Sequence, residues 1–281
     1  MKLLYYFLLL NFIFNEVSAQ VTTPPMSPRG KISQQVGLTH VEVDYSRPSA
    51  RGRNIMGGLV RYGELWRTGA NKNTTVSFSD PVEIKGNPLP AGKYGLYTRP
   101  GAKQWEVYFY KKNDLAGIPR DWEEDQIALQ ISVPTNYFDP MVETFTISLS
   151  DIHSNGAFLN LIWEHTIVMI PFDVPTEVKS MESIEKTLLG SPSSGDYFQA
   201  AVYYLQENKD LKKAQDWIER ALDMRENPAY WMYRQYALIL AKRKDKKAAL
   251  KAAKKSLELA KKAGNKDYVI MNKASIAEWS K

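Results

Sequence analysis

The chain has 281 residues, 44% of them hydrophobic, and no cysteine, which excludes disulfide bonds, thiolate metal sites and cysteine nucleophiles. A domain typically holds about 100 to 200 residues, so this length predicts two domains. The net charge is +6, but residues 196–281 hold 19 Lys and Arg against 11 Asp and Glu, a net of +8, which leaves −2 for the rest. The basic excess therefore belongs to the C-terminal part alone.

Residues 1–19 have the zones of a secretory signal peptide: Lys2, an apolar run over 3–14, and a small-residue end at Ala19. We predict cleavage after Ala19 and export to the periplasm or the medium. The alternative is a membrane anchor, which needs about 20 apolar residues, whereas Asn11 interrupts this run. We expect no transmembrane segment once the signal is removed.

Residues 20–31 contain three prolines and are predicted to form an extended arm. After it, residues 32–175 alternate apolar and polar side chains with a period of two, which is typical of strands with one buried face. The predicted strands cover residues 39–45, 74–78, 82–85, 94–98, 105–110, 126–133, 143–149 and 157–170. Turn sequences separate them, among them Asn155-Gly156. Many short strands without intervening helices predict an all-β antiparallel sandwich or barrel-like domain.

Helical spacing replaces this alternation in residues 176–195, which are predicted to form a helix followed by a linker. The linker, residues 190–195, is rich in Gly, Ser and Pro, and we expect the two domains to meet there. Residues 196–281 are predicted to be all-α. They repeat after 35 residues, as Ala214 and Ala249 illustrate. That period is similar to tetratricopeptide repeats, which stack helical hairpins of about 34 residues.

Several ordered motifs carry a family resemblance. They are Val-Asp-Tyr-Ser-Arg-Pro-Ser at 43–49, Gly-Arg at 52–53, Tyr-Gly-Glu-Leu-Trp-Arg-Thr-Gly-Ala-Asn at 62–71, Pro-Ala-Gly-Lys-Tyr at 90–94, and Val-Glu-Thr-Phe-Thr at 142–146. On these motifs, residues 32–149 resemble the DUF2911 family, a domain of unknown function in exported proteins of Bacteroidetes-type bacteria. Family members usually carry a proline where Arg61 stands. The resemblance implies kinship and export, and it implies no mechanism.

The segment 47–71 is the candidate ligand site, because it places several arginines among glycines. Guanidinium groups bind carboxylate or phosphate bidentately, and an indole can stack a ring or sugar. The candidate residues are Arg47, Arg53, Trp66, Arg67 and Asn71. In the alternative interpretation, Arg47 and Arg67 pair with internal acids such as Asp44 and Glu64, and Trp66 fills the core.

His40, Glu42 and Asp44 share one face of a predicted strand, which suggests a metal or acid/base cluster. The strict alternation around them favours a solvated strand face instead. We predict no metal site and no cofactor.

A helix in the basic part carries lysines along one side, opposite an apolar stripe of Leu250, Ala253, Leu257 and Ala260. The candidate partner-binding residues are Lys247, Lys251, Lys254 and Lys255. Such a face can meet an acidic protein, anionic lipid headgroups or acidic glycans, or it can be a plain solvated surface. Export argues against nucleic acid as the target.

These observations favour an exported, non-enzymatic binding protein with a possible anionic ligand at the arginine-rich loop and a protein partner at the hairpins. No phosphate-binding glycine loop, nucleophile elbow or zinc-protease motif occurs in the sequence. The alternative is a hydrolase of an anionic substrate such as a phosphate ester. It requires Arg47, Arg53 and Arg67 to converge on one pocket beside a carboxylate or histidine. A third hypothesis is an envelope scaffold with no pocket near Trp66.

Overall fold

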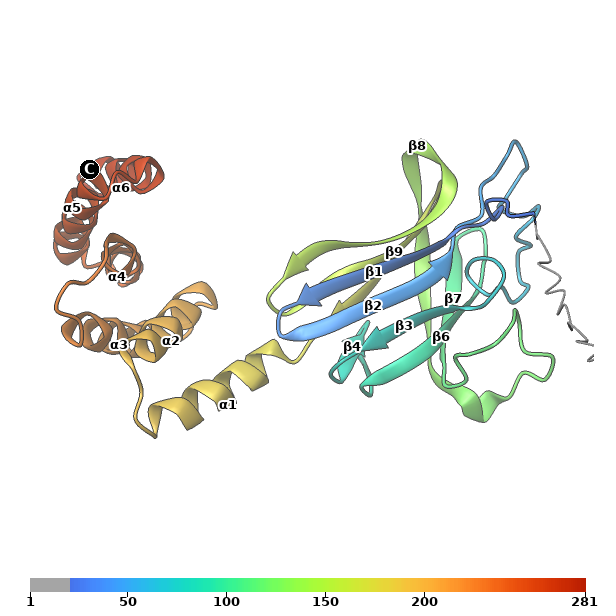
Figure 1. The fold of residues 1–281 in the computed structure, drawn as a ribbon, viewed down its shortest axis with the longest axis horizontal. Coiled ribbons are helices and arrows are strands. Elements are labelled where there is room, and N and C mark those ends of the chain that lie inside the picture. The colour runs from blue at the N-terminus through green and yellow to red at the C-terminus, as the bar shows by residue number, and fades with distance from the viewer. Residues whose placement is uncertain (1–20) are drawn as a thin grey trace, which may run out of the picture. The chain divides into compact units, whose positions relative to one another are not determined.

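The computed structural model describes residues 21–281, so the predicted signal peptide lies outside the described residues (Figure 1). The chain divides into two compact units between Val174 and Pro175. Within the described part, the first unit contains nine strands in one antiparallel sheet and the second contains six helices. The predicted fold class is therefore confirmed. The division precedes the Gly190–Gly195 segment where we expected the domains to meet, so the first helix belongs to the helical unit.

The sheet has the strand order β1-β2-β3-β6-β7-β8-β9-β4-β5. The strands are β1 (Arg29–Val36), β2 (Thr39–Ser46), β3 (Thr74–Phe78), β4 (Val82–Ile84), β5 (Asn87–Leu89), β6 (Gly92–Arg99), β7 (Gln104–Tyr110), β8 (Ile127–His153) and β9 (Gly156–Asp173). Several strand ends differ from the prediction by one to three residues, and three differences are larger. β1 begins inside the predicted arm, β5 occupies an expected turn, and the strands predicted at 126–133 and 143–149 are one strand, β8.

β8 explains how one sheet encloses a core. Its first part pairs with β7 up to Pro134, and from Thr135 onward it pairs with β9. Figure 1 shows β8 running from beside β7 to beside β9. This change of partner folds the sheet, so that alternate residues from both halves bury against each other as in a sandwich. Val43, Trp105 and Trp163 all belong to the resulting hydrophobic cluster.

The central strands are buried on their outer face as well. Tyr97, Tyr108 and Tyr110 form a second cluster there, under the segment that joins β7 to β8. In that segment Trp122 stacks on Tyr110 with ring centroids 4.5 Å apart. A short 3₁₀-helix at Glu124–Gln126 then leads into β8.

The helices are α1 (Thr176–Leu188), α2 (Ser194–Gln206), α3 (Leu211–Asp223), α4 (Tyr230–Lys242), α5 (Lys246–Lys262) and α6 (Lys266–Trp279). Polar caps define their starts: Ser193 forms a capping box with Asp196 at α2, and Asp210 caps α3. α2 packs on α3, α4 on α5, and α5 on α6. No helix within residues 21–281 has the length and apolar character needed to cross a membrane.

The sequence repeat coincides with equivalent helices, because α3 begins at residue 211 and α5 at residue 246, 35 positions apart. Ala214 and Ala249 occupy matching positions and are both fully buried. Of the apolar stripe expected on α5, Ala253 and Ala260 are buried, whereas Leu250 and Leu257 are only half-buried. The buried residues are Ala249, Ala252, Ala253, Ser256 and Ala260. All are small, which allows the α5 backbone to approach its neighbours closely.

Candidate functional site

The loop between β2 and β3 is fixed to the sheet at two places. Near its start, Ala50 N–H donates to the Glu143 carbonyl at 2.8 Å, and Phe145 N–H donates to the Pro48 carbonyl at 2.8 Å. Further on, Trp66 and Thr98 exchange backbone hydrogen bonds of 2.7 and 2.9 Å. The loop is therefore an ordered layer over β8 and β6, although its own sequence has no strand pattern.

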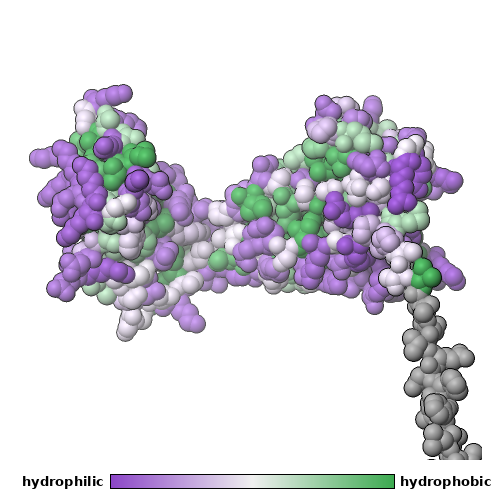
Figure 2. All heavy atoms as spheres, turned by 45° about the horizontal axis from the view of Figure 1, so that its top comes forward, coloured by the Kyte–Doolittle hydropathy of each residue, from purple (hydrophilic) through white to green (hydrophobic). Residues whose placement is uncertain are grey.

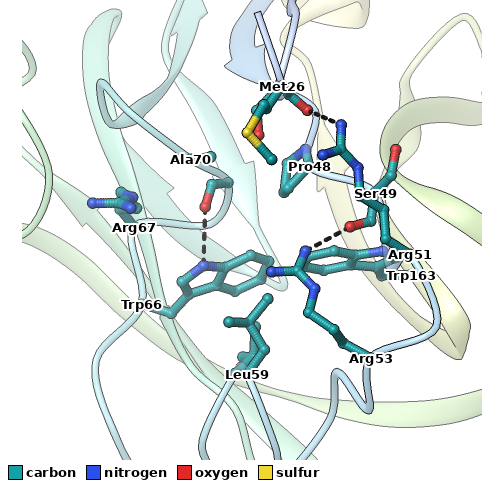
Figure 3. A pocket seen from close by; sticks show the side chains of 13 residues that line it. Met26, Pro48, Ser49, Arg51, Arg53, Leu59, Trp66, Arg67, Ala70 and Trp163 are labelled. Atoms are coloured by element: carbon teal, nitrogen blue, oxygen red, sulfur yellow. Dashed lines mark hydrogen bonds between the residues drawn. The ribbon is translucent and has the colours of Figure 1, made fainter.

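A cavity of about 370 Å³ lies under this loop (Figure 3). Its wall combines the loop with Met26 and Ser27 from the N-terminal arm and Trp163 from β9. Three arginines and two tryptophans contribute to the lining. Among the described residues that line it there is no carboxylate and no histidine. The cavity is thus basic and partly aromatic.

Trp66 serves both the core and the cavity. Its half-buried indole stacks on Trp163 with centroids 5.9 Å apart and an interplanar angle of 21°. It also meets Phe145 edge-on at 5.1 Å, and its Nε1–H donates to the Gly69 carbonyl at 3.1 Å. Because this ring is held on several sides, it presents a fixed apolar surface to the cavity.

Arg51 and Arg53 are held by carbonyl groups. Arg53 donates through Nε to Ala50 O at 2.9 Å and through Nη2 to Ser49 O at 2.8 Å. Arg51 donates through Nη2 to Met26 O at 3.1 Å, and its backbone N–H donates to a Glu143 carboxylate oxygen at 2.7 Å. A guanidinium has five N–H donors, so both side chains are oriented and retain donors for a ligand.

Arg67 is placed differently. Figure 3 shows its guanidinium pointing away from the Trp66 ring, on the far side of its loop. The guanidinium lies next to Gly117, because a Cβ atom placed on that glycine would be 3.2 Å from Arg67 Nη1. Burial raises the pKa of Tyr97 to about 12, and the nearby Arg67 charge partly opposes that rise. Arg67 therefore borders the cavity while its charge lies towards the tyrosine cluster.

Arg47 and Asn71 do not reach the cavity lining. Arg47 donates to Phe145 O at 3.3 Å and to Thr146 Oγ1 at 3.0 Å, and it lies over the Tyr45 ring. Asn71 is exposed and adopts a left-handed φ of 59°. Of the five predicted residues, the structure brings together Arg53, Trp66 and, at its edge, Arg67.

Within residues 21–281, no ion pair joins Arg47 or Arg67 to Asp44 or Glu64. Asp44 pairs with Arg29 at 2.7 Å, and Glu64 pairs with Arg61 at 3.4 Å. The same interpretation placed Trp66 in the core, which agrees with its packing on Trp163.

Sequence reasoning missed Met26 and Trp163 as cavity residues, and Arg51 lies in the candidate segment 47–71 without being one of the five chosen residues. The alternation of Leu159, Leu161 and Trp163 marks the tryptophan as inward-facing. No local signal, however, connects it to a loop about a hundred residues earlier.

The polar face of β2 is paired with β1. Glu42 forms an ion pair with Lys31 at 2.8 Å, and His40 Nε2 lies 3.3 Å from Ser33 Oγ. These are contacts of a solvated strand face. Within residues 21–281 no group of three His, Asp or Glu side chains is arranged to hold a metal ion.

The predicted lysines are all exposed on α5. Three of them, Lys251, Lys254 and Lys255, border a second cavity of about 640 Å³ together with Tyr233 and Tyr236 from α4. Lys247 lies outside that lining. The visible face of the helical unit is mostly hydrophilic, with smaller apolar areas (Figure 2).

Comparison with known proteins places the β unit in one family. The family described as "Protein of unknown function (DUF2911)" matches residues 27–172, which is more than half of the chain. No curated protein and no solved structure gives a match. The matched range contains the whole cavity lining except Met26. The chain therefore belongs to the DUF2911 family.

Proposed function

We propose that this chain is an exported, non-enzymatic binding protein whose β unit holds a small organic anion in the cavity under the β2–β3 loop. One observation carries the proposal. The guanidiniums of Arg51 and Arg53 are oriented by carbonyls and retain N–H donors, beside two indoles, in a lining without a carboxylate. The signal-like residues 1–19 support a periplasmic or extracellular location.

The dimensions and chemistry of the cavity favour a particular ligand class. Its volume of about 370 Å³ is that of a small-molecule site. Guanidiniums recognise carboxylate or phosphate, and the fixed Trp66 ring offers an apolar surface to a flat group. A ligand with one anionic group and one planar apolar part satisfies both.

Hydrolysis is less well supported than binding. The hydrolase hypothesis needs Arg47, Arg53 and Arg67 to converge, whereas Arg47 bonds to the β8 backbone and Arg67 points towards Gly117. Among the described lining residues no carboxylate or histidine is available as a general acid or base. The cavity therefore has groups for holding an anion and lacks groups for transferring a proton.

The helical unit is proposed to offer a second surface, for a protein partner. The 35-residue repeat and the matching buried Ala214 and Ala249 support hairpins of the tetratricopeptide-like kind. The exposed lysines of α5 support a partner of opposite charge. An exported location argues against nucleic acid.

Calorimetric titration of the mature chain, beginning at Gln20, tests the cavity. The probes are 2-naphthoate, phenyl phosphate and the neutral 2-naphthamide. We expect at least one anion to bind and the amide to bind at least about tenfold more weakly. Arg53→Ala and Arg51→Ala should each weaken binding by about tenfold or more, because each removes a charged donor. Arg47→Ala is the matched control, since its guanidinium lies outside the lining.

Two results would overturn the proposal. Equal binding of the acid and the amide would remove the role of the guanidiniums. Release of phenol from phenyl phosphate, lost in Arg53→Ala, would make the protein a hydrolase. The export component is tested separately by mass spectrometry of the protein recovered outside the cytoplasm, whose first residue should be Gln20.

A further inference from the structure

The second cavity is a groove between α4 and α5, and we define it by its lining. Its α4 side is formed by Tyr233 and Tyr236, and its α5 side by Ala248, Lys251, Ala252, Lys254, Lys255 and Glu258. The two alanines explain why a groove exists here, because their short side chains do not fill the space between the helices. Its volume of about 640 Å³ can hold several side chains.

The charge of the groove is positive and largely unpaired. Glu258 is the single acid of the lining, and it pairs with Lys255 at 3.3 Å. Lys251 and Lys254 make no ion pair or hydrogen bond with any side chain of the described chain, residues 21–281. The lining therefore carries three positive charges and one negative charge. Lys247, one turn before Lys251, adds a further exposed cation on the same helix.

The tyrosines give the groove an aromatic wall. The Tyr236 hydroxyl donates to Glu219 Oε1 at 2.6 Å, and Gln215 donates to the same oxygen at 2.7 Å. Glu219, the acid that Tyr236 contacts, is therefore already engaged within the helical unit. Tyr233 packs against the buried Met232 cluster, which holds its ring in place. Both rings are half-buried, so each leaves part of its surface for a partner.

The arrangement argues against a membrane surface as the partner. A helix that binds lipid inserts an apolar face between its basic residues. On α5 the alanines of that face, Ala249, Ala253 and Ala260, are fully buried in the helical unit, and Leu250 and Leu257 are half-buried. The lysines instead stand at the edge of a hollow with an aromatic wall, which fits a chain that can place side chains inside it.

We propose that the α4–α5 groove binds an acidic protein segment, whose carboxylates pair with Lys251 and Lys254 and whose apolar side chain lies against Tyr233 and Tyr236. This inference rests on the proposed function in one respect, that the helical unit binds a protein. It adds the surface and the chemistry of the partner. The cation pair specifies the acidic residues, and the aromatic wall specifies the apolar residue between them.

Fluorescence anisotropy with labelled synthetic peptides tests this on the full mature chain. The probe peptide contains glutamates flanking one phenylalanine, and the matched peptides replace either the glutamates by glutamine or the phenylalanine by serine. We expect the first peptide to bind, with an affinity that falls as salt rises. Each matched peptide should bind at least about fivefold more weakly.

The decisive variant is the charge reversal Lys251→Glu with Lys254→Glu. Its matched control is Lys261→Glu with Lys262→Glu, which makes the same change of net charge on the same helix, at exposed positions outside the groove. We expect at least about a tenfold loss for the first pair and less than about threefold for the second. Far-UV circular dichroism checks that both variants keep their helices, and Tyr233→Ser should weaken the phenylalanine peptide selectively.

Three results would overturn the inference. Equal losses of peptide affinity in the two charge-reversal variants would show that the positive charge of α5 as a whole attracts the peptide. The groove would then not be a specific site. Equal binding of the glutamate and glutamine peptides would remove the role of the lysines. Binding to vesicles of anionic lipid that is lost in the Lys251/Lys254 variant, without peptide binding, would assign the surface to lipid.

A failure of this inference can be distinguished from a failure of the proposed function. Titration of the Lys251/Lys254 variant with 2-naphthoate reports on the β unit alone. A protein partner that still binds this variant would leave the proposed function standing and would contradict only the groove.

Discussion

The cavity under the β2–β3 loop and the α4–α5 groove, both basic, are built in opposite ways. The cavity under the β2–β3 loop brings together Met26, Arg51 and Trp163, which are far apart in the sequence. Two of its arginines, Arg51 and Arg53, are bonded to backbone carbonyls. The α4–α5 groove is made by two consecutive helices, and its free lysines come from a single one. The first is a product of the tertiary fold and the second of local helical periodicity.

This difference shows when a basic residue indicates a site. In the loop, Arg47 and Arg53 are six positions apart and look equivalent in the sequence, yet only Arg53 lines the cavity. The role of each is decided by which carbonyl lies nearby, in strand β8 or in the loop itself. On α5, a spacing of three or four residues is enough to place lysines on one side.

The largest expected effect comes from breaking the long-range packing under the first cavity. Phe145→Ala removes a fully buried ring of β8 that contacts Trp66, Trp163 and Tyr45. We expect a loss of about 3 to 5 kcal/mol in the free energy of unfolding, because the vacated volume cannot collapse within a sheet. Urea denaturation monitored by tryptophan fluorescence measures it.

Tyr137→Ala is the control for that prediction. Tyr137 lies in the same strand, is 75% exposed and contacts the His165 ring. Apart from the contribution of its contact with the His165 ring, this substitution should change the free energy of unfolding by no more than about 0.5 kcal/mol. Similar losses in both variants would mean that the packing around Trp66 is not the main source of stability in this strand.

Period-two alternation was sufficient to predict most of the β unit. It placed β3 at its observed bounds and predicted a strand over 105–110, where the alternate residues Trp105, Val107 and Phe109 are buried. It missed the continuity of β8, because the irregular pairing between Tyr137 and Val142 interrupts the alternation. It also could not show that Tyr108 and Tyr110 are buried on the opposite face. Their cover, Trp122, comes from a segment without regular pattern.

The helical unit was predictable for a different reason. Helix caps and apolar spacing are local, so the helices followed from the sequence, and the repeat aligned Ala214 with Ala249. The apolar stripe named on α5 packs only in part, because Ala253 and Ala260 are buried and Leu250 and Leu257 are half-buried. Hydrophobicity favoured the leucines, whereas close helix contacts selected the small residues beside them.

Overpacking the close contact between α5 and its neighbouring helices is expected to have the next largest effect on stability. Ala249→Leu inserts a larger side chain at a fully buried position of α5. The free energy of unfolding should fall by about 1 to 3 kcal/mol, because neighbouring helices must move to admit it. Thermal denaturation followed by far-UV circular dichroism measures the change. Lys247→Leu, at an exposed position two residues earlier, is the control and should be nearly neutral.

Arg47→Ala separates structural from ligand-binding arginines. It removes hydrogen bonds to Phe145 O and Thr146 Oγ1 and leaves both acceptors partly unsatisfied. We expect a loss of about 1 to 2 kcal/mol in stability with unchanged affinity for the cavity ligand. Arg53→Ala should instead lower the affinity for the cavity ligand strongly and affect stability less. Paired calorimetry and urea denaturation distinguish the two, and weaker ligand binding in Arg47→Ala would contradict the assignment.

The smallest expected effect lies at the start of α2. The Ser193 side chain and backbone both donate to the Asp196 carboxylate, and Ser193 Oγ accepts from Asp196 N–H. Ser193→Ala should lower the free energy of unfolding by about 1 kcal/mol near neutral pH. Ser191→Ala, an exposed serine in the same linker, is the control.

The same cap has a pH dependence with a definite sign. Hydrogen bonds from the Ser193 side chain and backbone lower the pKa of Asp196 below its ordinary value of 3.8. The contribution of the ionised carboxylate is therefore fully present above 3.8 and is lost as the pH falls through the lowered folded-state pKa. Below the lowered pKa of Asp196, the native chain and Ser193→Ala should differ less in their free energy of unfolding. Urea denaturation at each pH measures this difference. A difference that stays constant across this range would show that the serine acts on the α2 backbone alone, without the carboxylate.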